Sequence, residues 1–78
     1  MKATIYSKPN CPYCVRAKML LENRGAEITE LSAVDQREQL IESVQGITGA
    51  PPKTVPQIWL DGEYVGGFQE LDARLKNH

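Results

Sequence analysis

Residues 3–14 read Ala-Thr-Ile-Tyr-Ser-Lys-Pro-Asn-Cys-Pro-Tyr-Cys, and this stretch decides the fold. Residues 3–7 are partly β-branched and aromatic, which predicts a short strand. The Lys-Pro-Asn that follows breaks the strand. A helix is expected over residues 12–24, because proline suits the first position of a helix and a glycine follows its end. Cys11 and Cys14 therefore fall at a strand-to-helix junction.

The second helix is predicted from a capping pattern and an apolar stripe. Asp35 is expected to cap this helix, with Glu38 three residues later in a capping-box arrangement. Gly46 and Gly49 are expected to end it. Its apolar stripe consists of Leu40, Ile41, Val44 and Ile47.

The remaining segments complete a small α/β fold. The predicted elements are a strand at 27–31, a strand at 57–60, a turn at Asp61-Gly62, a return strand at 64–65, and a last helix carrying Phe68, Leu71 and Leu75. The order is β-α-β-α-β-β-α. It predicts a four-stranded mixed β-sheet flanked by three helices that cover both faces. Residues 1–78 are expected to form a single domain.

Composition and charge exclude several classes of protein. The chain has 78 residues, 41% hydrophobic and 24% charged, which is ordinary for a soluble globular protein. Its net charge of −1 gives no reason to expect nucleic-acid binding. No apolar run approaches the length of a membrane span, and no secretory segment is evident. A cytoplasmic location is the expectation, and a structural disulfide would not persist there.

The charges are unevenly distributed along the chain. Residues 1–21 contain Lys2, Lys8, Arg16 and Lys18 and no acidic residue. Both cysteines therefore lie in a locally positive segment of a mildly acidic protein. The alternative interpretation is that Arg16 and Lys18 only form the solvated face of a helix.

The cysteine pair has three interpretations: half of a zinc site, a redox dithiol, or core residues. A structural zinc site takes about four ligands, but the chain offers only two cysteines and His78, so no metal is expected. Cysteine can also be a small core residue, which remains an alternative for Cys14. A cysteine pair with this spacing at a strand-to-helix junction favours the redox interpretation.

The two sulfurs are expected to differ. Cys11 stands just before the helix, where its sulfur can accept hydrogen bonds from the N–H groups of Tyr13 and Cys14. The helix dipole and nearby Lys8 also favour its thiolate. Cys14 points to the buried face of the helix. We expect Cys11, at the exposed tip, to attack a substrate disulfide and Cys14 to resolve the mixed disulfide.

Three motifs resemble the glutaredoxin family over nearly the whole chain. They are the segment from Cys11 to Lys18, the segment Thr54-Val55-Pro56, and the pair Gly66-Gly67. The resemblance implies a thioredoxin-like fold, catalytic residues Cys11 and Cys14, and glutathione as co-substrate without a metal. It also implies that Pro56 is a cis-proline facing the cysteines. The residues that it implies for glutathione binding are Lys8, Tyr13, Thr54, Val55, Pro56, Gly67, Phe68 and Gln69.

One segment departs from the family pattern. Many members carry a small or polar residue and then Asp after the two glycines, whereas this chain reads Phe68-Gln69-Glu70. Backbone contacts to the γ-glutamyl group should survive this change. Phe68 can equally be a core contact of the last helix.

The leading hypothesis is an enzyme that uses glutathione to reduce protein disulfides and glutathione mixed disulfides. Ribonucleotide reductase is one candidate partner, and a monomer is expected. One alternative is a small thioredoxin-like protein recharged by a reductase protein. Others are an iron–sulfur cluster carrier, built as a dimer around Cys11 thiolates, and an inert structural domain.

Overall fold

A computed structural model describes residues 1–76 of the chain, so His78 lies outside the described residues. Along these residues the elements follow the order β-α-β-α-β-β-α, which confirms the predicted order. The strands are β1 (Lys2–Ser7), β2 (Glu27–Ser32), β3 (Gln57–Leu60) and β4 (Glu63–Gly66). The helices are α1 (Pro12–Asn23), α2 (Arg37–Thr48) and α3 (Phe68–Lys76). No helix in this part of the chain is long and apolar enough to cross a bilayer.

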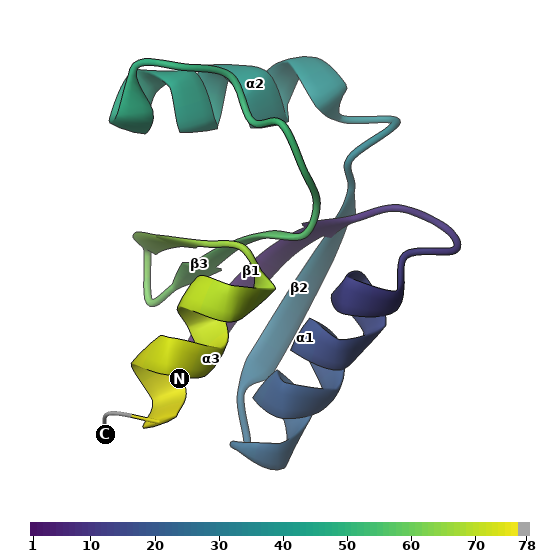
Figure 1. Cartoon of the computed structure of the whole chain (residues 1–78), viewed down its shortest axis with the longest axis vertical. Coiled ribbons are helices and arrows are strands. Elements are labelled where there is room, and N and C mark those ends of the chain that lie inside the picture. The colour runs from purple at the N-terminus through teal and green to yellow at the C-terminus, as the bar shows by residue number, and fades with distance from the viewer. Residues whose placement is uncertain (77–78) are drawn as a thin grey trace.

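The strands form one mixed sheet in the order β2-β1-β3-β4 (Figure 1). β1 runs parallel to β2 and antiparallel to β3, and β3 pairs antiparallel with β4. The β3–β4 hairpin turns at Asp61-Gly62, where the φ angles are 49° and 82°. Positive φ at both positions fits the predicted two-residue turn. β1 is thus an inner strand, and its carboxyl end leads directly into the cysteine loop.

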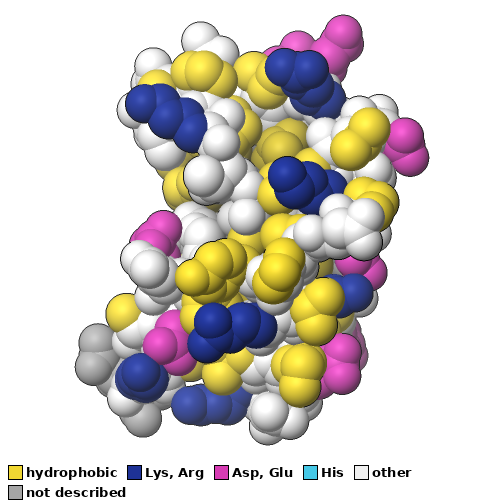
Figure 2. Space-filling view, turned by 45° about the vertical axis from the view of Figure 1, so that its right-hand side comes forward, with side chains coloured by type: hydrophobic (Ala, Val, Ile, Leu, Met, Phe, Trp, Pro, Cys, Tyr) yellow, Lys and Arg dark blue, Asp and Glu magenta, His cyan; other side chains and the backbone are white. Residues whose placement is uncertain are grey.

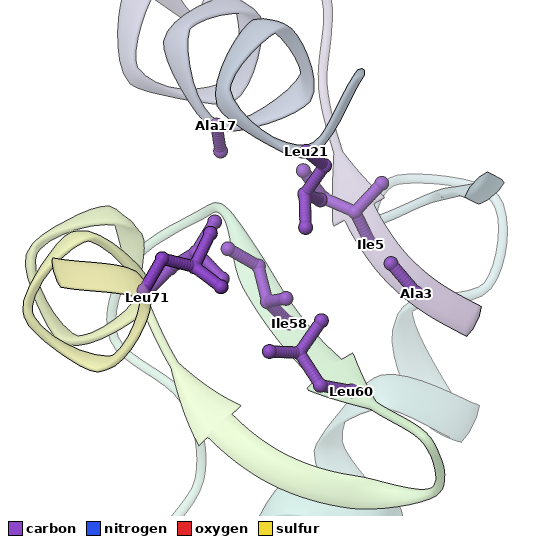
Figure 3. Packing of buried hydrophobic residues seen from close by; sticks show 8 residues of the cluster. Ala3, Ile5, Ala17, Leu21, Ile58, Leu60 and Leu71 are labelled. Carbon is purple, nitrogen blue, oxygen red and sulfur yellow. The ribbon is translucent and has the colours of Figure 1, made fainter. Parts of the chain in front are cut away.

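Helices cover both faces of the sheet, as predicted. Because successive side chains of a strand point to opposite faces, Ile5 and Tyr6 of β1 enter different cores. Tyr6 packs with Leu40 and Val44 of α2, and Ile5 lies in the core under α1 and α3 (Figure 3). The buried residues of that second core are Ala3, Ile5, Ala17, Leu21, Ile58, Leu60, Leu71 and Leu75. α1 is thereby held against the sheet through Ala17 and Leu21.

The start and the end of α2 differ from the prediction. Asp35 does not cap the helix, because the hydroxyl of Ser32 accepts the N–H groups of Val34 and Asp35 and closes a separate turn. Gln36 stands at the cap position without a side-chain hydrogen bond. Gly46 lies inside the helix, and Gly49, with φ of 83°, ends it.

Two smaller details of the helices also differ from the prediction. Ile47 is exposed, so the buried stripe of α2 consists of Leu40 and Val44. α1 ends at Asn23, and Arg24 is its cap residue, one position earlier than predicted. Differences of one residue at a helix end are common, because the last turn often tightens.

Candidate active site

The cysteine pair stands at the start of α1. Cys11 is the cap residue with extended backbone, and Pro12 occupies the first helical position. The N–H of Cys14 donates to Sγ of Cys11 at 3.2 Å. Among residues 1–76, Cys14 alone donates to this sulfur, so the second bond expected from Tyr13 does not form. The Cα atoms of Cys11 and Cys14 are 5.2 Å apart and a disulfide joins the sulfurs, so the structure describes the oxidised pair.

Both cysteines are buried, which corrects the expectation that Cys11 stands at an exposed tip. The exposed fractions are 7% for Cys11 and 2% for Cys14. The carbonyl oxygen of Val55 lies 3.9 Å from Sγ of Cys11, so a neighbouring loop covers part of this residue. Cys11 nevertheless lines a cavity of about 830 Å³ together with Lys8 and Lys18, whereas Cys14 does not. Access to the pair is therefore from the Cys11 side.

The loop beside Cys11 is held by a buried amide. The peptide bond between Val55 and Pro56 is cis, as the resemblance implied. Nε2 of Gln57, a side chain only 5% exposed, donates to the carbonyl oxygen of Thr54 at 2.8 Å. The hydroxyl of Tyr64 donates in turn to Oε1 of Gln57. Sequence reasoning missed this support; its only signal was a polar residue at the head of an apolar strand.

A groove of about 310 Å³ brings most of the predicted ligand residues together. Its lining residues are Tyr13, Thr54, Val55, Pro56, Gly67, Phe68, Gln69 and Glu70. These include every predicted glutathione-binding residue except Lys8, which lies instead beside Cys11 in the larger cavity. Phe68 packs against the core under α1 and α3, which confirms the predicted core contact, and it also lines the groove.

A second group of residues near Val55 is basic. Lys8, Arg37 and Lys53 line a cavity of about 570 Å³ whose lining contains no acidic residue. Val55 also lines this cavity and thus stands between it and the groove. Sequence reasoning missed Arg37 and Lys53, because only the folded chain brings the start of α2 next to the loop before β3. This cavity suits an anionic group.

A charged cluster lies on the other side of Cys11. Nζ of Lys18 donates to both carboxylate oxygens of Glu30, at 3.1 and 3.2 Å, and the hydroxyl of Ser7 donates to the same carboxylate. These hydrogen bonds hold the pKa of Glu30 below its usual value, and the bond from Ser7 has the larger effect. Lys18 is therefore more than a solvated side chain. Within residues 1–76, no three His, Cys, Asp or Glu side chains are grouped to hold a metal ion.

Replacing Glu30 with glutamine is expected to lower stability at neutral pH by less than about 1 kcal/mol, since the carboxylate is largely exposed. The carboxylate of Glu30 contributes to the stability of the fold only while it is ionised. Because its folded pKa is depressed, the contribution is lost as the pH falls through that value. Urea unfolding of both proteins at pH 7 and pH 3 checks this. A difference that is as large at pH 3 as at pH 7 would contradict it.

The start of α3 carries a cap that sequence reasoning missed. Oε1 of Glu70 accepts the N–H of Gly67 at 3.1 Å, so the side chain at the third helical position reaches back to the cap residue. This is one half of a capping box. The cap is hard to recognise from the sequence, because Gly67 stands where serine or threonine is typical.

Fold and site together define a class of protein. A parallel β1–β2 pair and an antiparallel hairpin form the sheet, and a disulfide-bonded Cys-x-x-Cys pair starts the first helix. The cis-proline segment lies against this pair through Val55. This arrangement is the thioredoxin-like fold with a redox-active cysteine pair.

Comparison with known proteins gives the family. A family model described as Glutaredoxin matches residues 3–65. The chain is 38% identical to Glutaredoxin 1 of Escherichia coli strain K12 over 82 residues, which cover 100% of this chain and 96% of that relative. The chain therefore belongs to the glutaredoxin family and is a thiol–disulfide oxidoreductase.

Solved structures agree with this assignment. Glutaredoxin 1 from Francisella tularensis, complexed with cacodylate, matches with a TM-score of 0.73 and 36% identity over 97% of this chain and 93% of that one. A buckwheat glutaredoxin–glutathione complex matches with a TM-score of 0.77 and 26% identity over 96% of this chain and 68% of that one. The resemblance inferred from the three motifs is thus confirmed at the level of fold and family.

Proposed function

We propose that this chain reduces protein disulfides and glutathione mixed disulfides, with Cys11 as nucleophile, Cys14 as resolving thiol and glutathione as reductant. One observation carries the proposal. The sulfur of Cys11 lies at the start of α1, accepts the N–H of Cys14, and adjoins the groove through Val55. A helix start with a backbone donor stabilises a thiolate, which is the attacking form of cysteine.

The reaction balances as two thiol–disulfide exchanges followed by regeneration. The Cys11 thiolate attacks one sulfur of the substrate disulfide, forms a mixed disulfide, and releases the other half as a thiolate that takes up a proton. Cys14 then loses its proton and attacks Sγ of Cys11, which releases the second thiol and leaves the Cys11–Cys14 disulfide. Two molecules of glutathione reduce that disulfide and leave as glutathione disulfide.

Glutathione is proposed to lie in the groove. The backbone of Val55 would pair with the cysteine of glutathione as an added strand, with Tyr13 as one wall and Thr54 and Pro56 beneath it. The basic cavity of Lys8, Arg37 and Lys53 would attract the glycine carboxylate. The structure of a buckwheat glutaredoxin–glutathione complex, which shares this fold, supports the proposal.

The γ-glutamyl end is proposed to lie at the start of α3, against Gly67, Phe68 and Gln69. Glu70 already accepts the N–H of Gly67 there. Its carboxylate would therefore meet the ammonium group of the ligand, and remaining backbone N–H groups would meet the ligand carboxylate.

The choice of reductant can be tested directly. The oxidised protein is given a mixed-disulfide substrate and either glutathione with glutathione reductase or thioredoxin reductase alone, and NADPH consumption is recorded. We expect turnover only with glutathione. Turnover only with thioredoxin reductase would replace the proposal with the thioredoxin-like alternative. A coloured, dimeric protein from purification would instead support a cluster carrier.

We propose that residues 1–78 act as one domain and as a monomer in the cytoplasm, and that ribonucleotide reductase is one of the protein substrates. Sedimentation of the reduced protein tests the monomer. Reduction of oxidised ribonucleotide reductase, with insulin as a comparison substrate, tests the partner.

A further inference from the structure

Arg16 is held in place by two aromatic rings. Its guanidinium carbon lies 4.9 Å from the ring centroid of Phe68 and 5.5 Å from that of Tyr13. The two rings are 5.8 Å apart and tilted by 38°. Aromatic faces attract a guanidinium group, so this exposed side chain is partly ordered before any partner arrives. We call Tyr13, Arg16 and Phe68 the arginine–aromatic cluster.

The cluster stands at the rim of the groove. Tyr13 and Phe68 line the groove, whereas Arg16 lies over their rings and does not line it. Tyr13 is 51% exposed, and the neighbouring side chains of Val15 and Met19 on α1 are exposed as well. The guanidinium group therefore lies beside the exposed surface of α1 that a polypeptide leaving the groove would cross.

Arg16 also lacks a carboxylate partner within the described part of the chain. The ion pairs of residues 1–76 join Lys18 to Glu30, Arg74 to Glu63 and Lys76 to Asp72. Residues 1–21 contain no acidic residue at all. Figure 2 shows Lys and Arg side chains set among hydrophobic ones on one face of the molecule. An ordered cation without a partner, beside exposed apolar side chains, is complementary to an acidic polypeptide segment.

We propose that the arginine–aromatic cluster binds the polypeptide half of a mixed-disulfide substrate and favours an acidic residue next to the substrate cysteine. This inference rests on the proposed function, in which the groove holds the glutathione half of the same disulfide. The polypeptide half is too large for the groove and must lie over the exposed surface around it. Arg16 is the cation at that rim, and Phe68, the departure from the family pattern, is the ring closest to it.

Single-turnover reduction of two peptides tests this inference. The full-length protein is reduced, freed of reductant, and mixed with peptide–glutathione disulfides that differ only by Glu or Gln beside the peptide cysteine. Released peptide thiol is measured against time. We expect the Glu peptide to react about threefold faster with the unchanged protein, as one exposed ion pair allows. At about 1 M salt this preference should largely vanish.

Variants of Arg16 and of Arg24, the cap residue at the far end of α1, provide the matched comparison. Arg16→Gln should react with both peptides at the rate of the Gln peptide. Arg24→Gln removes the same charge from an exposed residue at the far end of the helix and should keep the preference. Arg16→Lys should retain only part of it, since lysine lacks the planar group that stacks on rings.

Several results would overturn the inference. One is equal rates for both peptides with the unchanged protein; another is an equal loss of preference in Arg24→Gln, which would indicate a general field of the molecule. A raised KM for glutathione in Arg16→Gln, with the peptide preference intact, would assign the cluster to glutathione. Failure to reduce either peptide would refute the proposed chemistry of Cys11 itself, and the inference with it.

Discussion

Replacing Cys11 with serine is expected to reduce turnover of a glutathione mixed disulfide to the uncatalysed rate. A serine hydroxyl has nearly the same size but forms no disulfide, so the first exchange cannot occur. The helix start and the N–H of Cys14 would remain in place without a thiolate to stabilise. The measurement is NADPH consumption coupled through glutathione reductase, with unfolding in urea recorded to show that the variant is folded.

Replacing Cys14 with serine is the control. This variant keeps the attacking sulfur, so it should still reduce glutathione mixed disulfides, with a second glutathione resolving the intermediate. It should lose the reduction of protein disulfides that needs both thiols. Cys14 is almost fully buried, so a loss of stability in urea is expected and must be measured alongside activity. Full activity of Cys11→Ser would refute the mechanism, and so would equal losses of both activities in the two variants.

The elements around the cysteines could be predicted because their signals are local. A proline at the first helical position, a glycine after the helix and an Asp-Gly turn each act through the conformation of their own backbone. The alternation of Ile5 and Tyr6 likewise follows from strand geometry alone. The order of elements and the redox interpretation of the pair followed from these signals and the cysteine spacing.

The remaining features depend on contacts that form only in the folded chain. The prediction that Asp35 caps α2 was wrong, because the hydroxyl of Ser32 accepts the backbone N–H groups of Val34 and Asp35 and forms a separate turn there. The burial of Cys11 depends on Val55, which is distant in sequence. In the same way, no pattern placed Arg37 beside Lys8, or Arg16 over the ring of Phe68.

Replacing Gly66 with alanine is expected to destabilise the protein by about 2–3 kcal/mol, as the sum of two effects. Gly66 has φ of 117°, a conformation that costs an L-residue roughly 1–2 kcal/mol. A Cβ atom there would also lie 2.9 Å from Oε1 and 3.2 Å from Cγ of Glu70. Glu70 must therefore move, and α3 loses its bond to the N–H of Gly67, a loss of about 1 kcal/mol for a helix cap.

Two further variants separate these causes. Gly46→Ala makes the same change inside α2, where no atom beyond the adjoining backbone of the helix lies within 4 Å of the new Cβ, and should stabilise by roughly 0.5–1 kcal/mol. Glu70→Ala removes only the cap and should cost about 1 kcal/mol. Urea unfolding measures the free energy of unfolding of all three variants, provided that the slope of that free energy against urea concentration stays the same. If Gly66→Ala cost no more than Glu70→Ala, the positive φ would contribute nothing. The stability of the junction between β4 and α3 would then depend on the cap alone. Glycine at position 66 would be needed only to leave room for the side chain of Glu70, and not to form the turn.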